Sequence, residues 1–237
     1  MPKTYRRKTN RNPKRKQYRK RNYRRGKWPN KPYYNLSNTP LPKQFCTKLK
    51  YTDAFSINPA AGTVGEYRFL ANDLYQPNAM TTGHQPYGFD QLMAMYDHFC
   101  VIGAKIRFRV SVPSNNDQPF IMLIQVNDGA ALTQANNVTA VMEQPRTKRK
   151  IISKPSNATG NELELTHTFS TKSFFHLKSL IGQSQFQGDA GSRPTEQALF
   201  ICGIAPMDAV ADLAAYTCTA EIVYTAVFTE PRILNQS

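Results

Sequence analysis

Positive charge is concentrated at the N-terminal end of this chain, so only the remaining residues are suited to form a hydrophobic core. Residues 1–35 contain fifteen Lys or Arg and no Asp or Glu, and the first acidic residue is Asp53. Residues 36–237 contain the other sixteen basic residues and all sixteen acidic ones, so the net charge of +15 belongs to the N-terminal arm. The arm has almost no aliphatic side chains to bury, so we expect it to be disordered when free.

The charge boundary divides the chain into three parts. Residues 1–35 form the basic arm, residues 36–44 a Pro-containing linker, and residues 45–237 a formally near-neutral body. About 200 residues suit one all-β domain or a small two-domain chain. Val, Ile, Phe, Tyr and Thr are frequent in the body, so it can bury a sizeable core.

Alternating apolar and polar side chains predict that the body is mostly β-structure. The strongest alternation covers 102–112 and places Lys105, Arg107 and Arg109 on one face of a strand. Residues 120–126 are apolar on both parities, which indicates a strand covered on both faces. Further strands are expected at 45–57, 66–70, 148–153, 163–169, 198–205 and 218–228, and short helices at 89–96, 132–142 and 173–181.

The order of these elements favours one fold class. About eight strands are separated by long connections, with no βαβ rhythm and no internal repeat. This pattern fits a single β-sandwich of two facing sheets, with a jelly roll favoured. The edges of such sheets need protection, and packing against neighbouring copies is one way to provide it.

Several stretches of the body are more specific than a generic β-domain. They are Ile57-Asn58-Pro59-Ala60-Ala61-Gly62, Phe69-x-Ala71-Asn72-x-x-Tyr75-x-Pro77, Gly83-His84-Gln85-Pro86-Tyr87-Gly88-Phe89-Asp90-Gln91, Tyr96-Asp97-His98-Phe99, Pro194-Thr195-Glu196-Gln197 and Val227-Phe228-Thr229-Glu230-Pro231. In these stretches the chain resembles the capsid proteins of circovirus-like viruses, small eukaryotic viruses with circular single-stranded DNA that encode their own replication initiator. The resemblance covers the arm and most of the body.

This resemblance implies a fold and a function. It implies a single jelly roll that assembles, as sixty copies, into a T=1 icosahedral shell. It also implies that the basic arm points inward onto a circular single-stranded DNA genome and doubles as a nuclear import signal. The expected locations are the virion and the host cell nucleus, and the expected partners are the genome, further copies of the chain and a nuclear import receptor.

The arm contains the candidate nucleic-acid contacts. Its cations can neutralise phosphates with counterion release, and its aromatic side chains can stack on unpaired bases. The cations are Lys3, Arg6, Arg7, Lys8, Arg11, Lys14, Arg15, Lys16, Arg19, Lys20, Arg21, Arg24, Arg25, Lys27 and Lys31, and the aromatic candidates are Tyr5, Tyr18, Tyr23 and Trp28. A solvated charge run or a ribosomal-type extension is the alternative for the arm. Anchoring against the body is the alternative for Trp28, Tyr33 and Tyr34.

Two parts of the arm fit a nuclear localisation cluster, namely Lys14-Arg15-Lys16 and Arg19-Lys20-Arg21. Within the body, Lys105, Arg107 and Arg109 are candidate interior phosphate contacts. Arg146, Lys148, Arg149 and Lys150 form a second basic cluster. For both body clusters, a solvated face or ion pairing between subunits remains the alternative interpretation.

The sequence offers no pattern for a cofactor, a metal or catalysis. His84, His98, His167 and His176 have no partner at metal-ligand spacing, and His167 lies on the apolar parity of its strand, as a core histidine would. There is no Gly-rich phosphate loop, G-x-S-x-G or H-E-x-x-H motif. No run approaches the ~18 apolar residues of a membrane span. We therefore expect no enzyme, no cofactor, no metal and no membrane insertion.

The four cysteines are widely spaced, so we expect free thiols that pack as small hydrophobes.

Three functions remain as hypotheses. The first is a self-assembling capsid subunit that packages single-stranded DNA. The second is a non-assembling protein that binds single-stranded nucleic acid, and the third is a capsid protein that packages RNA. Phosphates and base faces are common to DNA and RNA, so the arm does not distinguish between the first and the third.

Overall fold

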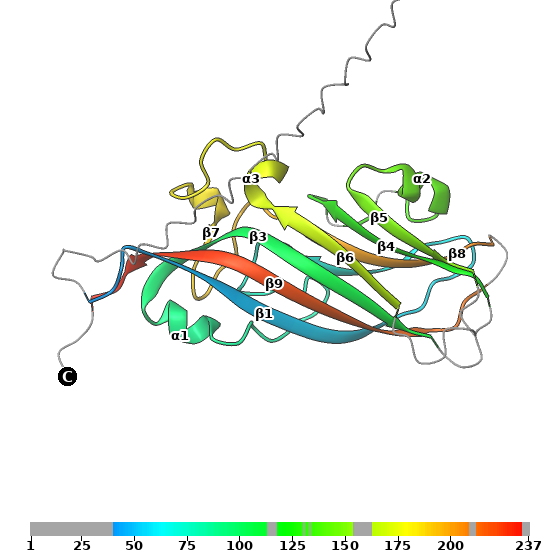
Figure 1. Cartoon of the computed structure of the whole chain (residues 1–237), viewed down its shortest axis with the longest axis horizontal. Coiled ribbons are helices and arrows are strands. Elements are labelled where there is room, and N and C mark those ends of the chain that lie inside the picture. The colour runs from blue at the N-terminus through cyan, green and yellow to red at the C-terminus, as the bar shows by residue number, and fades with distance from the viewer. Residues whose placement is uncertain are drawn as a thin grey trace, which may run out of the picture. The chain divides into compact units, whose positions relative to one another are not determined.

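The computed structural model describes residues 40–112, 118–129, 131–132, 134–153, 163–208 and 212–233. All of them lie in one compact unit, Asn35–Ser237. Figure 1 shows this unit as two layers of β-strands with short helices in the connections.

The strands form two antiparallel sheets. The five-stranded sheet runs β1 (Gln44–Ile57), β9 (Tyr216–Pro231), β3 (Tyr96–Ser111), β6 (Leu163–Ser170), with the short β7 (Gln187–Gly188) also paired to β3. The four-stranded sheet runs β2 (Gly65–Leu70), β8 (Leu199–Pro206), β4 (Phe120–Asn127), β5 (Thr147–Ile152). This order, in which the first and last strands pair and most sheet neighbours are far apart in sequence, is that of a jelly roll. The predicted fold class is confirmed.

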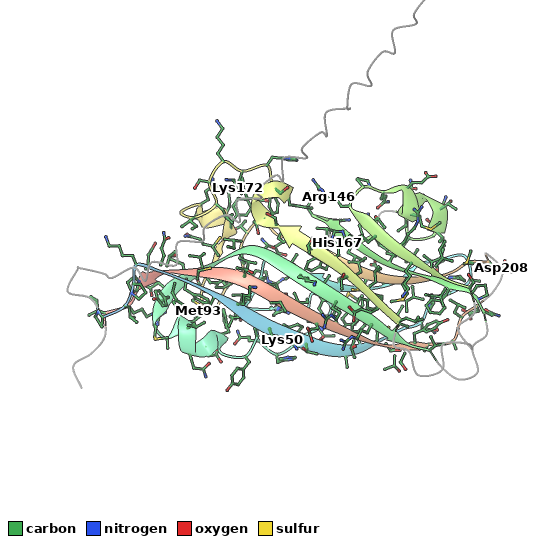
Figure 2. The ribbon with its side chains drawn as sticks, in the orientation of Figure 1. Lys50, Met93, Arg146, His167, Lys172 and Asp208 are labelled. Atoms are coloured by element: carbon green, nitrogen blue, oxygen red, sulfur yellow. The ribbon has the colours of Figure 1, made fainter. Side chains whose placement is uncertain are left out.

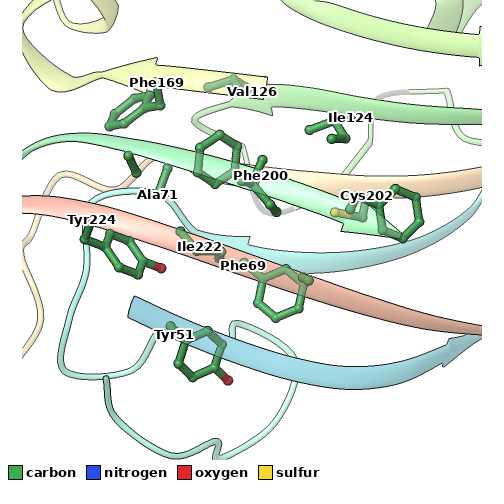
Figure 3. Close-up of a cluster of buried hydrophobic side chains, with 14 of the residues drawn as sticks. Tyr51, Phe69, Ala71, Ile124, Val126, Phe169, Phe200, Cys202, Ile222 and Tyr224 are labelled. Atoms are coloured by element: carbon green, nitrogen blue, oxygen red, sulfur yellow. The ribbon is translucent and has the colours of Figure 1, made fainter. Parts of the chain in front are cut away.

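The main core lies between the two sheets, where the inward-facing side chains of each strand meet. Figure 3 shows Phe69, Phe200 and Cys202 of the four-stranded sheet close to Tyr51, Ile222 and Tyr224 of the five-stranded sheet. All six side chains are buried. The Tyr224 hydroxyl donates a hydrogen bond of 2.7 Å to the Leu70 carbonyl, so the one polar end of this side chain is satisfied across the sandwich.

Strand β4 is covered on both faces, as its sequence predicted. Phe120, Met122 and Ile124 face the main core, whereas Leu123 packs in a smaller cluster on the opposite face. Helix α2 (Val138–Glu143) contributes Val141 to this smaller cluster. The Asn137 side chain accepts a hydrogen bond from the Ala140 N–H, which caps the start of α2. The helix is shorter than the 132–142 that was predicted.

A β-bulge in β3 changes the predicted orientation of one side chain. The alternation placed Ile102 on the same face as Ile106, but the pairing with β9 shifts between Val101 and Gly103. Ile102 therefore packs in the outer cluster that contains Cys100 and Phe186. A side chain at Gly103 would crowd β6, because a Cβ there would lie 3.0 Å from the Phe169 carbonyl oxygen.

Two predicted helices are shorter than expected. Helix α1 is Phe89–Met93, and Tyr96, which was predicted to lie in this helix, belongs to β3. The Tyr96 hydroxyl donates a hydrogen bond to the Pro42 carbonyl. The predicted helix at 173–181 is wrong for most of its length. The chain forms α3 (Thr171–Phe174), turns, and adds the 3-10 turn η2 (Ser184–Phe186). Its apolar residues cover Cys100 on the outer face of β3 and do not line one side of a helix.

The stretch Gly83–Gln91 fixes the loop that leads into α1. The His84 ring stacks on Tyr51 with centroids 4.6 Å apart, and a Cβ at Gly83 would lie 2.9 Å from the Tyr51 hydroxyl. Gly88 begins the helix at a φ of 87°, a conformation that favours glycine. Phe89 is buried against Phe99. Several residues of this motif are therefore explained by packing.

The buried Asp73 makes stability depend on pH. Its carboxylate accepts hydrogen bonds from the Tyr75 and Gln76 N–H groups, at 2.9 and 3.2 Å, and orders the loop after β2. Burial raises the pKa of Asp73 to about 6, and these hydrogen bonds only partly oppose it. The folded protein therefore holds this proton more tightly than the unfolded chain does. Its contribution to stability is fully present below about pH 4 and is lost as pH rises through about 6.

We expect wild type to lose up to about 3 kcal/mol of unfolding free energy relative to Asp73→Asn between about pH 4 and about pH 7. The amide cannot ionise, so the variant lacks this pH dependence. Urea unfolding of both proteins across this range measures the difference. Parallel stability curves for the two proteins would contradict the expectation.

Candidate nucleic-acid interface

All predicted arm contacts lie outside the described residues, together with the nuclear localisation cluster. They remain predictions from sequence. The described candidates are the basic residues of the body, which fall on two different parts of the sandwich.

The outer face of the five-stranded sheet collects the first group. Lys105, Arg107 and Arg109 of β3 point away from the core, because Ala104, Ile106, Phe108 and Val110 alternate with them and are buried. The register places Arg107 opposite Glu221 of β9 and Arg109 opposite Glu164 of β6. Cations from one strand thus lie directly between carboxylates from its two neighbours.

These carboxylates pair with two of the three predicted cations. Arg107 Nε lies 3.1 Å from Glu164 and its Nη1 lies 3.5 Å from Glu221, while Arg109 Nε lies 3.3 Å from Glu164. Lys105 pairs with no carboxylate among the described residues. The ion pairing considered from the sequence was between subunits. The structure shows that ion pairs also form within the subunit.

Strand β1 adds two cations that were not among the predicted sites. Lys48 and Lys50 occupy the polar parity of β1, and the register with β9 brings them onto the face that carries Lys105. Lys50 Nζ lies 2.6 Å from Glu221, and this hydrogen bond lowers the pKa of the Glu221 carboxyl. Figure 2 labels Lys50 on this strand. The alternation at 45–57 already predicted that Lys48 and Lys50 point away from the core. Only the sheet order shows that β1 and β3 both pair with β9, which brings these lysines near Lys105.

The resulting face is positively charged and hollowed. In the middle of this face, five cations from β1 and β3, namely Lys48, Lys50, Lys105, Arg107 and Arg109, stand near the two carboxylates of Glu164 and Glu221. A shallow depression of about 360 Å³ lies between Lys48, Lys105 and Arg107, with Val223 and Thr225 on its floor. Lysine ammonium groups and threonine hydroxyls at such a surface can hydrogen-bond phosphate oxygens.

The second predicted cluster is divided by the structure. Lys148 and Arg149 are adjacent in β5 and therefore point to opposite faces of the four-stranded sheet. Lys148 Nζ donates to the Thr166 carbonyl of β6 at 3.3 Å, whereas Arg149 Nη1 donates to the Met142 carbonyl of α2 at 2.9 Å. Arg146 precedes the strand, with its guanidinium 4.3 Å from the centre of the Phe174 ring. These four cations do not form one patch.

The histidines occupy separate environments. His167 is half-buried, and its two ring nitrogens contact the carbonyls of Thr168 and Arg146 at 2.9 and 3.1 Å. Burial lowers its pKa, although both contacts oppose that effect. A neutral imidazole has one N–H, so it donates to only one of these carbonyls at a time. His167 thus lies at the sandwich edge and not deep in the core. His98 lies 3.7 Å from Glu230.

Three further observations concern metals, thiols and membranes. Within the described ranges, no group of three or more His, Cys, Asp or Glu side chains is placed to hold a metal ion. All four cysteines are free. Cys100, Cys202 and Cys218 are buried, as expected for small hydrophobes, but Cys46 is exposed. No helix in the described part of the chain is long and apolar enough to cross a membrane.

Comparison with known proteins finds a likeness in fold. No protein-family model matches the chain, and no curated protein matches it. Among solved structures, it is similar to the BFDV capsid protein in its 60-mer form, with 11% identity and a TM-score of 0.46 over 83% of this chain and 100% of that one. A chain of Cocksfoot mottle virus gives 10% identity and 0.47 over 80% and 96%. A chain of Mud crab tombus-like virus gives 13% and 0.46 over 84% and 96%. At such identities the likeness concerns the fold alone.

Proposed function

We propose that this chain is a viral capsid subunit that self-assembles into a T=1 icosahedral shell and packages circular single-stranded DNA through its basic arm. The observation that carries the proposal is the combination of two features in one chain. The body has the strand order of a jelly roll, and the arm contains an excess of positive charge equal to that of the whole chain. A near-neutral folded body joined to a polycation suits a shell that holds a polyanion.

The outer face of the five-stranded sheet supports the same proposal. It offers cations that Glu164 and Glu221 only partly balance, around a shallow depression that a single nucleic-acid strand can contact. In this proposal the arm supplies most of the phosphate neutralisation, and Lys48 and Lys105 supply further contacts. Lys14, Arg15, Lys16, Arg19, Lys20 and Arg21 are proposed to bind a nuclear import receptor of the host before assembly.

The test of the proposed function is the behaviour of the expressed full chain. Negative-stain microscopy is expected to show closed particles of uniform size, and nuclease treatment of opened particles is expected to identify the packaged strand as DNA. A soluble monomer or small oligomer that binds single strands would support the non-assembling alternative. Particles whose contents are removed by ribonuclease alone would support an RNA-packaging capsid.

On the sheet face, removing positive charges and removing a negative charge are expected to change the salt dependence of nucleic-acid binding in opposite directions. For single strands, the slope of log affinity against log salt changes by about 0.7 for each phosphate neutralised. Replacing Lys48 and Lys105 with Ala should therefore flatten the slope by up to about 1.4, and Glu221→Gln should steepen it by about 0.7. Salt titration on a fluorescent oligonucleotide measures both changes. Arg149→Ala, on the other sheet, is the matched control, and an equal flattening in this control would remove the sheet face from the interface.

A further inference from the structure

A second basic hollow lies at the edge of the sandwich and adjoins the depression on the sheet face, with which it shares Thr168 and Phe169. It has a volume of about 450 Å³ and is formed by the turn before β5, the end of β6 and helix α3. Arg146, Ser170, Ser173 and His176 line it around a floor that includes Phe174. None of its described lining residues is Asp or Glu, whereas the depression on the sheet face includes Glu221. Figure 2 shows Arg146 and His167 at this edge.

Arg146 presents a flat cation in this hollow. Its guanidinium carbon lies 4.3 Å from the centre of the Phe174 ring, so one face of the group is covered by the aromatic side chain. The residue is exposed, and no carboxylate among the described residues pairs with it. A guanidinium that packs on an aromatic ring keeps its N–H groups available as hydrogen-bond donors, and its other planar face remains available for stacking.

The backbone conformation at Arg146 and His176 is one that glycine adopts more readily than other residues. Both have positive φ, at 61° and 54°. His176 follows the C-cap of α3, and the Leu177 N–H donates to the Lys172 carbonyl at 3.0 Å, which is the closing bond of a Schellman motif. Glycine is usual at this position, because it has no Cβ to strain. Arg146 and His176 occupy two such positions at the expense of backbone strain, and both line the same hollow.

His167 positions the Arg146 turn. Its ring spans the two sheets, from the Thr168 carbonyl of β6 to the Arg146 carbonyl before β5. The Val126 N–H also donates to the Arg146 carbonyl, at 3.3 Å. Both ring nitrogens of His167 therefore face backbone carbonyls of the protein, and a neutral ring donates to one of them at a time. The donors left for a ligand are the Arg146 guanidinium, the His176 ring and the hydroxyls of Ser170 and Ser173.

We propose that this hollow binds one nucleotide of a single strand, with its base stacked on the open face of Arg146 and its phosphate held by Ser173 and His176. The inference rests on the proposed function, since it names a nucleic-acid contact of the same subunit. Arginine planes stack unpaired bases, and hydroxyl and ring N–H groups donate to phosphate oxygens. The stack of base, guanidinium and phenyl ring explains why Arg146 lies over Phe174 and makes no ion pair.

The test is photo-crosslinking of the full chain to an oligothymidylate that carries 4-thiothymidine, in salt high enough to weaken arm binding. The tryptic peptide between Lys172 and Lys178 contains Ser173, Phe174 and His176, so it reports on the hollow directly. In Arg146→Gly, crosslinking of this peptide should fall by about tenfold. The melting temperature should not fall with it, because glycine relieves the positive φ. His176→Gly provides a second variant of the same kind.

Arg149→Ala is the matched control, because Arg149 lies nearby in sequence but faces α2. It should retain the wild-type crosslink. An equal crosslink in wild type and Arg146→Gly, or an equal loss in the control, would overturn the nucleotide site. Particle formation and packaged nucleic acid, measured on the same preparations, separate the two proposals. Particles that hold nucleic acid without this crosslink refute only the hollow, whereas absence of particles refutes the capsid function.

Discussion

A chain that begins at Leu36 is expected to stay folded and β-rich and to lose most of its nucleic acid. The two sheets are built from residues that follow Lys43, and the hydrogen bond from Tyr96 to the Pro42 carbonyl is retained. The deletion removes all fifteen arm cations and leaves a body with no formal net charge. Circular dichroism and the absorbance ratio of purified material measure the two effects. Wild-type retention by the shortened chain would show that the arm is not the main contact.

The salt dependence of binding separates charge from stacking within the arm. Fifteen cations set a ceiling of about −10 for the slope of log affinity against log salt on single strands, and incomplete contact should bring it to about half of that. Replacing Lys14, Arg15, Lys16, Arg19, Lys20 and Arg21 with Ala should flatten the slope by up to about 4.

Replacing Tyr18, Tyr23 and Trp28 with Ala should weaken binding and leave the slope almost unchanged, because stacking releases few counterions. If the aromatic variant changes the slope as much as the charge variant, or leaves affinity unchanged, the stacking role is refuted.

The second large effect is expected in the core, from Phe108→Ala. Phe108 is fully buried between the sheets and stacks on Phe55 with ring centroids 6.1 Å apart. Replacing a buried Phe with Ala costs about 3–5 kcal/mol, from lost burial and from the cavity that remains. Domains are stable by only about 5–15 kcal/mol, so this variant should lose a large share of its free energy of unfolding.

Urea unfolding measures the loss in Phe108→Ala, and Lys105→Ala is the matched control on the opposite face of the same strand. The control should change stability by less than about 0.5 kcal/mol. A loss below about 1 kcal/mol for Phe108→Ala would mean that the two sheets do not pack as described.

Local patterns were sufficient for the class of fold. Period-two alternation identified the strands because a side chain's face in a sheet depends only on its parity. The apolar residues at both parities of β4 correctly predicted that other parts of the protein pack against both faces of this strand. The charge boundary near residue 35 also predicts an arm that cannot bury a core, and this stays a prediction. These inferences needed no knowledge of which strands are neighbours.

Contacts between distant segments decided the candidate sites. Lys48 and Lys105 share a face because β9, from the end of the chain, lies between β1 and β3. Glu221 of β9 and Glu164 of β6 balance Arg107 and Arg109 because both of these strands pair with β3.

One extra residue at the bulge reversed the orientation of Ile102, and packing against the outer face of β3 replaced the predicted helix at 173–181. The hollow between Arg146 and His176 joins segments that no periodicity relates. Parity along a strand is a local property of the backbone, whereas the neighbours of a strand depend on long-range pairing, which the sequence pattern of one segment does not encode.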